Sequence, residues 1–277
     1  MYVGPTRMGM ADICAYSSGD NVGYGYLHDS CGHCQQCLTG RETFCPGRVV
    51  YGYGDLDQGS FSSHSIRREA FLFTIPSGMK NEDAAPLMCG GATVFNVLDM
   101  YNVRPMDRIG VIGVGGLGHL AIQFASKMGC EVAVFSGTES KKAEAMRLGA
   151  KEFYATKGLK ELKIEKPIDR LLVTTSAQPD WNLYLPIMAS SGVIYPLSVS
   201  QDDLKVPYMP LIANGLRIQG SLIAPRAIHN RMLEFAAFHG IKPMIQKFPL
   251  DVDGITEAMR KLNEGDIRYR GVLVAQD

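Results

Sequence analysis

Four cysteines that follow one another closely near the start of the chain constrain its fold most strongly. They are Cys31, Cys34, Cys37 and Cys45, in the pattern Cys-x2-Cys-x2-Cys-x7-Cys. Such short gaps allow one loop to surround a single ion, and four thiolates in a tetrahedral arrangement form a closed structural zinc site. The loop also contains Gly32, Gly40 and Gly47, which help its backbone to turn. The sequence therefore predicts a structural zinc lobe.

The alternative is a pair of disulfides, which need an oxidising compartment. Residues 1–20 contain no apolar segment of the signal-peptide kind, and no apolar run approaches the roughly 18 residues of a membrane span. These features favour metal over disulfides, and a cytoplasmic location. Cys14, Cys89 and Cys130 are isolated in sequence, and an isolated cysteine is usually a small buried hydrophobic side chain.

The composition limits the classes of partner. The 277 residues are 46% hydrophobic, which supports one large domain or two modest ones. The chain carries 28 basic and 28 acidic side chains. A net charge of zero gives no reason to expect nucleic acid or an anionic membrane as a partner. We expect a small-molecule substrate and a second copy of the chain, in a homodimer.

Strand and helix patterns alternate through the middle of the chain. Residues 1 to about 80 are typical of strands and loops, and a helical pattern begins at Asn81, the expected N-cap. Short apolar segments bounded by turn residues predict strands at 108–112, 131–135, 171–174, 192–197 and 217–222. Helical patterns at 119–128 and 140–148 separate the first three. This alternation predicts a doubly wound parallel sheet. The tail predicts helices at 230–239 and 253–264 and strands at 244–250 and 269–275.

A glycine-rich turn lies directly between the first of these strands and its helix. It contains Gly113, Gly115, Gly116, Leu117 and Gly118 in the pattern G-x-G-x-x-G. In this context the first glycine makes the tight turn, the second lets a pyrophosphate approach, and the third lets helix and strand pack. The helix N-terminus then binds the phosphates. The alternative is a glycine-rich turn that binds no ligand.

The end of the second strand indicates which dinucleotide is bound. An NAD site usually places a carboxylate there, whereas this chain has Ser136 and Thr138, followed by Lys141. Two hydroxyl groups and a cation suit the 2′-phosphate of NADP. Glu139 is an objection, although a helix could turn it to solvent. The alternative for the lysine is an ordinary solvated helix face.

Several motifs together resemble the zinc-containing medium-chain alcohol dehydrogenases, and most closely the NADP-dependent cinnamyl-alcohol-dehydrogenase type. They are the cysteine lobe, the segment 85–94 (APLMCGGATV), the glycine turn and the tail 265–270 (GDIRYR). The resemblance covers nearly the whole chain. It implies a partial GroES-like catalytic domain with the zinc lobe at 1–80, a Rossmann NADP-binding domain at 81–225, and a segment at 226–277 that returns to the catalytic domain.

The resemblance also implies roles for individual residues. The structural zinc falls on the four clustered cysteines, and a ligand of the catalytic zinc falls on Cys89. Thr93 corresponds to a residue that lines the nicotinamide site. Ser136 and Lys141 match the hydroxyl and the lysine that select the phosphate, and Arg270 lies near the cofactor cleft.

One part of the family pattern is missing. We find no Gly-His-Glu motif and no first catalytic cysteine, since Cys14 has no motif around it and His28, His33 and His64 stand elsewhere. A catalytic zinc needs about three protein ligands, so Cys89 is left without its partners. We expect that the N-terminal block is lacking, through an incomplete gene model, a missed exon or a real truncation.

The expected activity is hydride transfer between NADPH and an aldehyde or alcohol, impaired by the truncation. One alternative is a non-catalytic, zinc-stabilised homologue that binds NADP, or a subunit that pairs with intact relatives. Another is zinc-independent reduction of an activated alkene, against which the retained zinc lobe argues.

Overall fold

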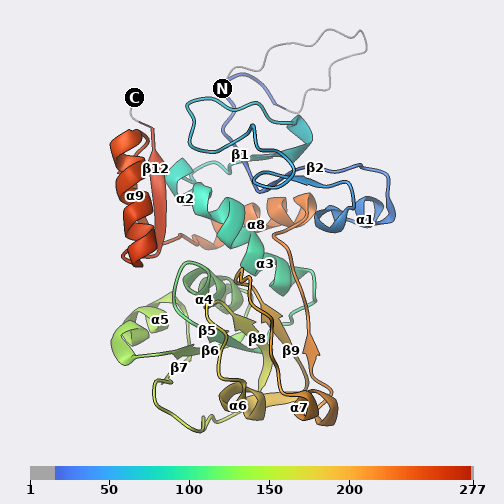
Figure 1. Ribbon diagram of the computed structural model, residues 1–277, viewed down its shortest axis with the longest axis vertical. Coiled ribbons are helices and arrows are strands. Elements are labelled where there is room, and N and C mark those ends of the chain that lie inside the picture. Colours follow the sequence, from blue (N-terminus) through green and yellow to red (C-terminus); the bar gives the residue numbers. More distant parts are fainter. Residues whose placement is uncertain (1–15, 276–277) are drawn as a thin grey trace.

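The computed structural model describes residues 16–275 of the chain. A β-rich part and a part built on one larger sheet lie at opposite ends of the molecule, joined by helices (Figure 1). Among the described residues, no helix has both the length and the apolar character needed to cross a membrane.

The larger sheet has six parallel strands in the order β10-β9-β8-β5-β6-β7. These strands are β5 (Arg108–Ile112), β6 (Glu131–Ser136), β7 (Glu152–Ala155), β8 (Ile168–Val173), β9 (Met188–Pro196) and β10 (Arg217–Ile218). If β5 is numbered 1 and β10 is numbered 6, the strands lie in the order 3-2-1-4-5-6, read from β7 to β10. This is the doubly wound arrangement, and its chain direction across the sheet reverses between β5 and β8. Dinucleotides bind outside the carboxyl ends of the strands at such a point.

Helices cover both faces of this sheet. They are α4 (Gly118–Lys127), α5 (Lys142–Leu148), α6 (Trp181–Tyr184) and α7 (Tyr208–Ala213), with a short 3-10 turn, η4 (Glu139–Lys141), ahead of α5. All of β5 is buried, and its alternate side chains enter different cores. Ile109 and Val111 pack with α4, whereas Ile112 packs with Trp181 of α6. The two apolar cores fix the sheet between its helices.

Between residues 16 and 275, the β-rich part contains three two-stranded sheets. Antiparallel pairs join β1 (Val22–Tyr24) to β4 (Leu72–Thr74) and β2 (Leu27–Asp29) to β3 (Val49–Val50). Strand β11 (Ile245–Pro249) pairs in parallel with β12 (Arg270–Val274), and α9 (Val252–Glu264) connects them. The cysteine lobe contains α1 (Gln35–Leu38) and the 3-10 turn η1 (Glu42–Phe44), and a second such turn, η2 (Glu69–Phe71), precedes β4.

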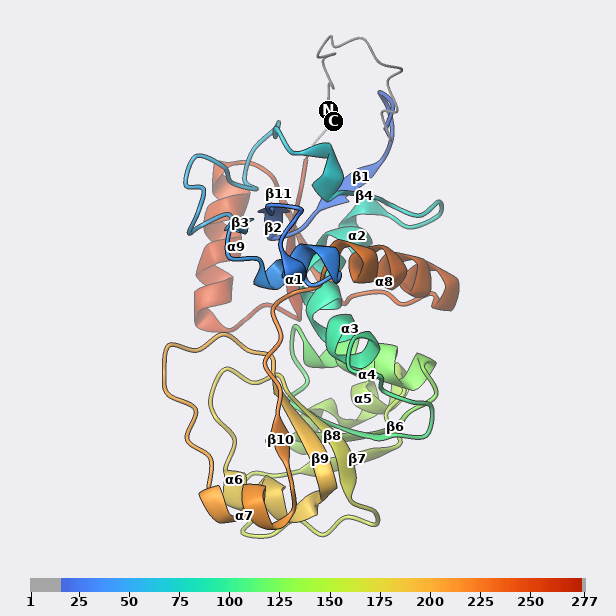
Figure 2. The same cartoon turned by 90° about the vertical axis from the view of Figure 1, so that its right-hand side faces the viewer.

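A continuous helical segment joins the two parts. It runs through α2 (Asn81–Pro86), a π-helical turn η3 (Leu87–Gly91) and α3 (Ala92–Asp99). Helix α8 (Arg226–His239) packs on α3 (Figure 2). Pi-helical turns inside helices occur frequently at functional sites, and this one contains Cys89.

The predicted parallel doubly wound sheet is confirmed. Strand β7 was not predicted, β10 is shorter than the expected 217–222, and α8 begins before residue 230. The predicted N-cap at Asn81 is wrong, because α2 begins at Asn81 and its N-cap is Lys80. The side-chain oxygen of Asn81 instead accepts a 2.6 Å hydrogen bond from Asn21. Cys130 is buried as expected, Cys89 is exposed, and Cys14 lies outside the described residues.

Candidate cofactor site and active-site pocket

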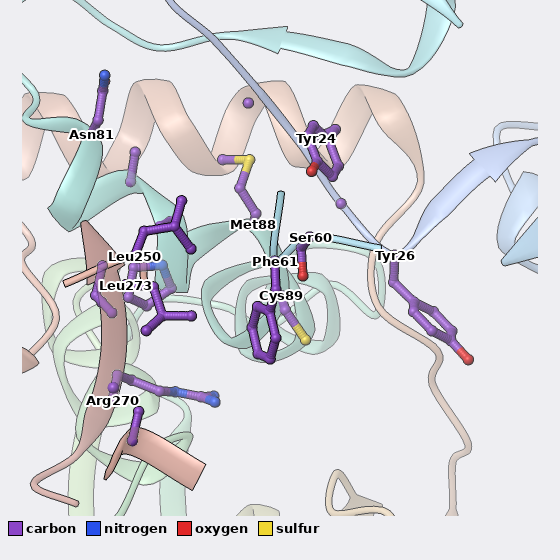
Figure 3. Close-up of a pocket in the computed structure, with 18 of the residues that line it drawn as sticks. Tyr24, Tyr26, Ser60, Phe61, Asn81, Met88, Cys89, Leu250, Arg270 and Leu273 are labelled. Carbon is purple, nitrogen blue, oxygen red and sulfur yellow. The ribbon is translucent and has the colours of Figure 1, made fainter. Parts of the chain in front are cut away.

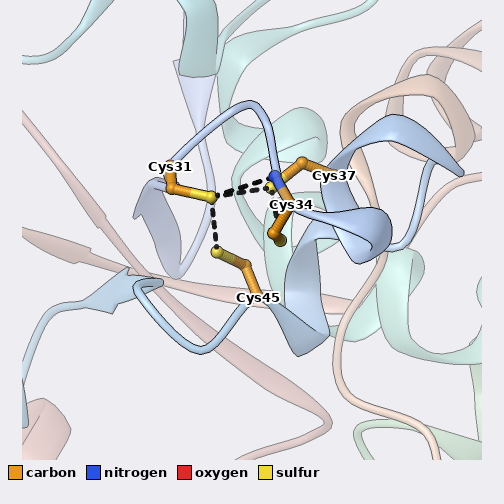
Figure 4. Close-up of side chains that lie close together, drawn as sticks. All are labelled: Cys31, Cys34, Cys37 and Cys45. Atoms are coloured by element: carbon orange, nitrogen blue, oxygen red, sulfur yellow. Dashed lines mark hydrogen bonds between the residues drawn. The ribbon is translucent and has the colours of Figure 1, made fainter.

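The four clustered cysteines converge on one point (Figure 4). Their sulfur atoms all lie within 4.8 Å of one another. The Sγ atoms of Cys31 and Cys45 are 3.5 Å apart, those of Cys34 and Cys37 3.6 Å, and those of Cys31 and Cys37 3.9 Å. A tetrahedral zinc with Zn–S bonds of about 2.3 Å requires sulfur separations of about 3.8 Å. The cluster therefore fits a four-thiolate zinc site.

The lobe affects its thiols unequally, because the pKa of Cys31 is lowered, whereas burial and hydrogen bonds with neighbouring thiols raise the pKa of Cys34 to about 11. Hydrogen bonding from the backbone N–H of His33, followed by that of Cys34, lowers the pKa of Cys31 to about 6. Metals bind the thiolate and not the thiol, so a lowered thiol pKa favours metal binding at neutral pH.

A half-buried ion pair fixes the lobe to the rest of the protein. Glu42, in η1, is only 3% exposed, and one of its carboxylate oxygens accepts bonds from the backbone N–H and the Nε of Arg226 at 2.8 and 3.1 Å. Arg226 is the first residue of α8, and its guanidinium lies 4.8 Å from the centre of the Phe71 ring. The zinc lobe is thus anchored on the helix that follows the six-stranded sheet.

The glycine turn after β5 has the geometry of a phosphate cradle. Gly113 has φ +94°, which favours glycine, and a Cβ on Gly118 would lie 2.0 Å from the carbonyl oxygen of Gly113. These two glycines are needed by the fold itself. Gly115 differs, because a Cβ there would meet nothing within 4 Å. The free space beside its backbone fits a pyrophosphate, and the N-terminus of α4 follows directly.

His119 ties this loop to the returning segment of the chain. It is fully buried, its Nδ1 lies 2.8 Å from the carbonyl oxygen of Gly115, and its Nε2 accepts a 3.1 Å bond from the backbone N–H of Met244. Nδ1 therefore carries the proton. Burial lowers the pKa of His119 to about 4, so the ring is neutral at pH 7.

At the end of β6 the predicted phosphate-selecting residues lie close in sequence and face solvent to different degrees. Ser136 and Lys141 are partly buried, and Thr138 is exposed, with its hydroxyl 2.8 Å from that of Ser140. The Nζ of Lys141 donates a 2.7 Å bond to the carbonyl oxygen of Val114, inside the glycine turn. The end of β6 and the glycine turn therefore form one continuous surface. Glu139 pairs with Lys142 at 3.2 Å and is exposed, which agrees with its expected turn toward solvent.

A cavity of about 600 Å³ lies against the π-helical turn (Figure 3). Its polar groups include the thiol of Cys89 and the guanidinium of Arg270, which both point into it. Aromatic rings contribute much of the remaining wall: Tyr24, Tyr26, Tyr51 and Phe61. Apolar residues of α9 and β12 close the opposite side. The cavity suits an apolar or aromatic small molecule with one polar end.

Arg270 connects this cavity to the glycine turn. Its Nε donates a 3.0 Å bond to the carbonyl oxygen of Gly116, and a Cβ on Gly90 would lie 2.2 Å from one terminal nitrogen. Gly90 and Gly116 therefore leave the space that the guanidinium fills. Burial lowers the pKa of Arg270, which remains a cation at neutral pH.

The residues around Cys89 do not complete a second metal site. Thr93 lies one turn further on and donates its hydroxyl to the carbonyl oxygen of Cys89 at 2.8 Å. Between residues 16 and 275, the only cluster of three or more His, Cys, Asp or Glu ligand atoms is the four-cysteine lobe. The described residues therefore fit a structural zinc but not a catalytic one.

The predicted site residues thus form two groups. The glycine turn, Lys141 and Arg270 are joined by direct bonds, and Cys89 shares a cavity with Arg270, whereas the zinc lobe lies apart. Sequence reasoning missed His119, Tyr269 and Glu144, which hold these parts together. The Gly-His pair after the glycine turn was an available signal for the first of them.

Comparison with known proteins agrees with this geometry. The family model "Alcohol dehydrogenase GroES-like domain" matches residues 5–77, and the family model "Zinc-binding dehydrogenase" matches residues 116–237. The chain is 36% identical over 262 residues to a probable formaldehyde dehydrogenase of Bacillus subtilis, covering 92% of this chain and 74% of the relative. It is 34% identical over 271 residues to NADP-dependent alcohol dehydrogenase C 1 of Mycolicibacterium smegmatis, covering 95% of this chain and 77% of the relative.

Solved structures show the same likeness. A cinnamyl alcohol dehydrogenase from Sorghum bicolor superimposes with a TM-score of 0.83 at 31% identity, covering 93% of this chain and 75% of the other. A Helicobacter pylori enzyme solved with NADP(H) superimposes with a TM-score of 0.78 at 27% identity, covering 93% of this chain and 76% of the other.

Fold and site together define a zinc-stabilised, dinucleotide-binding oxidoreductase. The glycine turn on a doubly wound sheet and the separate four-thiol lobe are the features that characterise this class. More narrowly, the chain belongs to the zinc-containing alcohol dehydrogenase family. The predicted family resemblance and fold class are thereby confirmed.

Proposed function

We propose that the protein is an NADP-dependent alcohol dehydrogenase or aldehyde reductase. The observation that carries this proposal is the position of Arg270, whose guanidinium bonds the glycine turn and points into the cavity that contains Cys89. A dinucleotide on the turn and a small molecule in the cavity would then be neighbours, as hydride transfer requires.

Three observations support NADP over NAD. No carboxylate stands at the tip of β6, Ser136 offers a hydroxyl there, and Lys141 supplies a cation bonded to the glycine turn. The Mycolicibacterium smegmatis relative and the Helicobacter pylori structure are also described by their names as NADP-dependent or NADP(H)-bound.

The chemistry is shared between cofactor and chain. When bound, NADPH would supply the hydride to the carbonyl carbon, and the carbonyl oxygen would take a proton from water as the alcohol forms. The backbone at Gly115 and the N-terminus of α4 would hold the phosphates, and Arg270 would add positive charge beside them. The aromatic cavity wall orients the substrate and excludes water, which favours an aromatic aldehyde. Because the ligands beside Cys89 are incomplete in the described residues, no step is assigned to a catalytic metal.

NADPH consumption with aromatic and aliphatic aldehydes tests this proposal. We expect turnover with NADPH that exceeds turnover with NADH, and a marked loss in Arg270→Met. Complete inactivity of a folded, zinc-replete preparation would refute the activity. The non-catalytic alternative gains no support from the relatives, which are named dehydrogenases. Turnover separates the two, since metal analysis of either should give the one zinc per chain that the four thiolates of the lobe predict.

We further propose a homodimer formed through the free edge of the six-stranded sheet. Strand β10 is the last strand on that side, and α7 beside it exposes Tyr208 by 75%, Met209 by 66% and Ile212 by 60%. An uncovered edge and an apolar helix face favour association with a second copy. Light scattering of the wild type should give twice the chain mass of 30.3 kDa. The double variant Met209→Glu, Ile212→Glu should give the mass of a monomer. A wild-type monomer would contradict this. We also propose a cytoplasmic location, which the free thiols of the zinc lobe support.

A further inference from the structure

The ammonium group of Lys141 is held by the glycine turn and by an aromatic ring. Its Nζ donates a 2.7 Å bond to the carbonyl oxygen of Val114 and lies 5.0 Å from the centre of the Tyr269 ring. An ammonium group has three N–H donors. A carbonyl and a ring face therefore leave at least one donor for a ligand at the tip of β6.

The Tyr269 ring is fixed in turn by a buried carboxylate. Its hydroxyl donates to Glu144, which is 4% exposed, and Arg268 donates to the same carboxylate at 2.7 Å. Glu144 lies in the first turn of α5, just after Lys141. The His119 ring also packs near the Tyr269 ring, with the two ring centres 5.2 Å apart.

This arrangement suits a ring that binds a cation. A phenol whose hydroxyl donates to a carboxylate becomes richer in electrons, and the face of such a ring attracts an ammonium more strongly. Burial lowers the pKa of Lys141, with the charge of Arg268 acting in the same direction and the carboxylate of Glu144 acting against both. The ring face, 5.0 Å from the ammonium, also favours its charged form.

We propose that Tyr269 is a positioning residue for cofactor specificity, which holds the ammonium of Lys141 ready for the 2′-phosphate of NADP. The proposal rests on the proposed use of NADP. A lysine side chain free to rotate loses rotamer entropy when it is fixed by a ligand. Tyr269 removes part of this cost before the cofactor binds. The choice of cofactor thus depends on a residue immediately before β12, in the returning segment of the chain.

Calorimetric titration of the full chain with 2′,5′-ADP and with 5′-AMP tests the proposal without any catalysis. The two probes differ only in the 2′-phosphate. We expect the wild type to bind 2′,5′-ADP more tightly than 5′-AMP. Tyr269→Leu should lower the affinity for 2′,5′-ADP by roughly tenfold and the affinity for 5′-AMP by less than about twofold. Tyr269→Phe keeps the ring and should restore most of the preference. Lys151→Ala removes an exposed charge elsewhere and should change neither affinity.

A double-mutant cycle supplies the second readout. Lys141→Ala should abolish the preference, and Tyr269→Leu added to it should cause no further selective loss, because both act through one ammonium group. Equal weakening of both probes by Tyr269→Leu, a Phe variant as defective as Leu, or additive effects in the cycle would overturn the inference. A wild type that binds the two probes alike would instead refute the use of NADP itself.

Discussion

Gly115 offers the sharpest test of the phosphate cradle, because the structure predicts that an alanine there harms binding and not folding. A Cβ at this position meets nothing within 4 Å, and the backbone needs no left-handed φ. Gly118→Ala is the matched opposite, since its Cβ would lie 2.0 Å from the carbonyl oxygen of Gly113.

The expected magnitudes follow from these contacts. A methyl group on Gly115 keeps a pyrophosphate from the backbone and disrupts one charge-assisted hydrogen bond of about 1.5–3 kcal/mol. NADPH affinity should therefore fall by roughly 10- to 100-fold. Gly118→Ala forces helix α4 away from β5 and should cost about 2–3 kcal/mol of stability, or about 5–10 °C in Tm.

Fluorescence titration with NADPH and thermal melting of each variant give both quantities. Gly220→Ala serves as the control, since a Cβ there also meets nothing within 4 Å and lies outside the turn. The reasoning is refuted if Gly115→Ala binds NADPH like the wild type, or if it melts as early as Gly118→Ala.

Three further predictions concern metal, pH and a buried ion pair. Cys45→Ser should remove the bound zinc from the lobe and lower Tm by several degrees, and elemental analysis that finds unchanged zinc would contradict the four-thiolate site. Burial lowers the pKa of His119 to about 4 and that of His229 to about 3, below 6.5 in the unfolded chain. The unfolded chain then binds more protons below pH 6.5, so stability is complete above that pH and falls as the pH drops. The loss should reach about 2 kcal/mol per histidine at pH 5 in urea titrations. His119→Gln should make the stability fall less between pH 6.5 and pH 5, because one buried neutral histidine is removed. An unchanged pH dependence of stability would contradict the lowered pKa of His119. Arg108 is buried between two partly exposed carboxylates at 2.6 and 3.0 Å. Arg108→Leu should destabilise by about 2 kcal/mol in the same assay, and a neutral result would show that the pair contributes little.

Features that depend on neighbouring residues could be predicted from the sequence. The glycine turn, the strand before it and the four cysteines each carry their pattern within a few positions. Strand β7 was missed because its short segment Glu152–Ala155 begins with a charged residue, which Arg108 of β5 neutralises across the sheet. Helix α8 starts earlier than its apolar pattern because Pro225 precedes Arg226, which Glu42 of the zinc lobe anchors.

The supports of the candidate site could not be predicted, because they join residues far apart in the chain. Tyr269 reaches Glu144, and Met244 reaches His119, across more than a hundred intervening positions. Each of these residues looks ordinary in its own segment. Only the return of the chain from β11 and β12 brings them against the glycine turn.

That return has a consequence for how the protein is made. Arg268, Tyr269 and Arg270 are synthesised after every strand of the six-stranded sheet, yet they complete the environment of Lys141 and Gly116. Chains emerge from the ribosome N-terminus first and their domains fold in that order. The six-stranded sheet can therefore form on the ribosome before residues 268–270 have emerged, so the surroundings of Lys141 and Gly116 are completed only after the sheet that carries them.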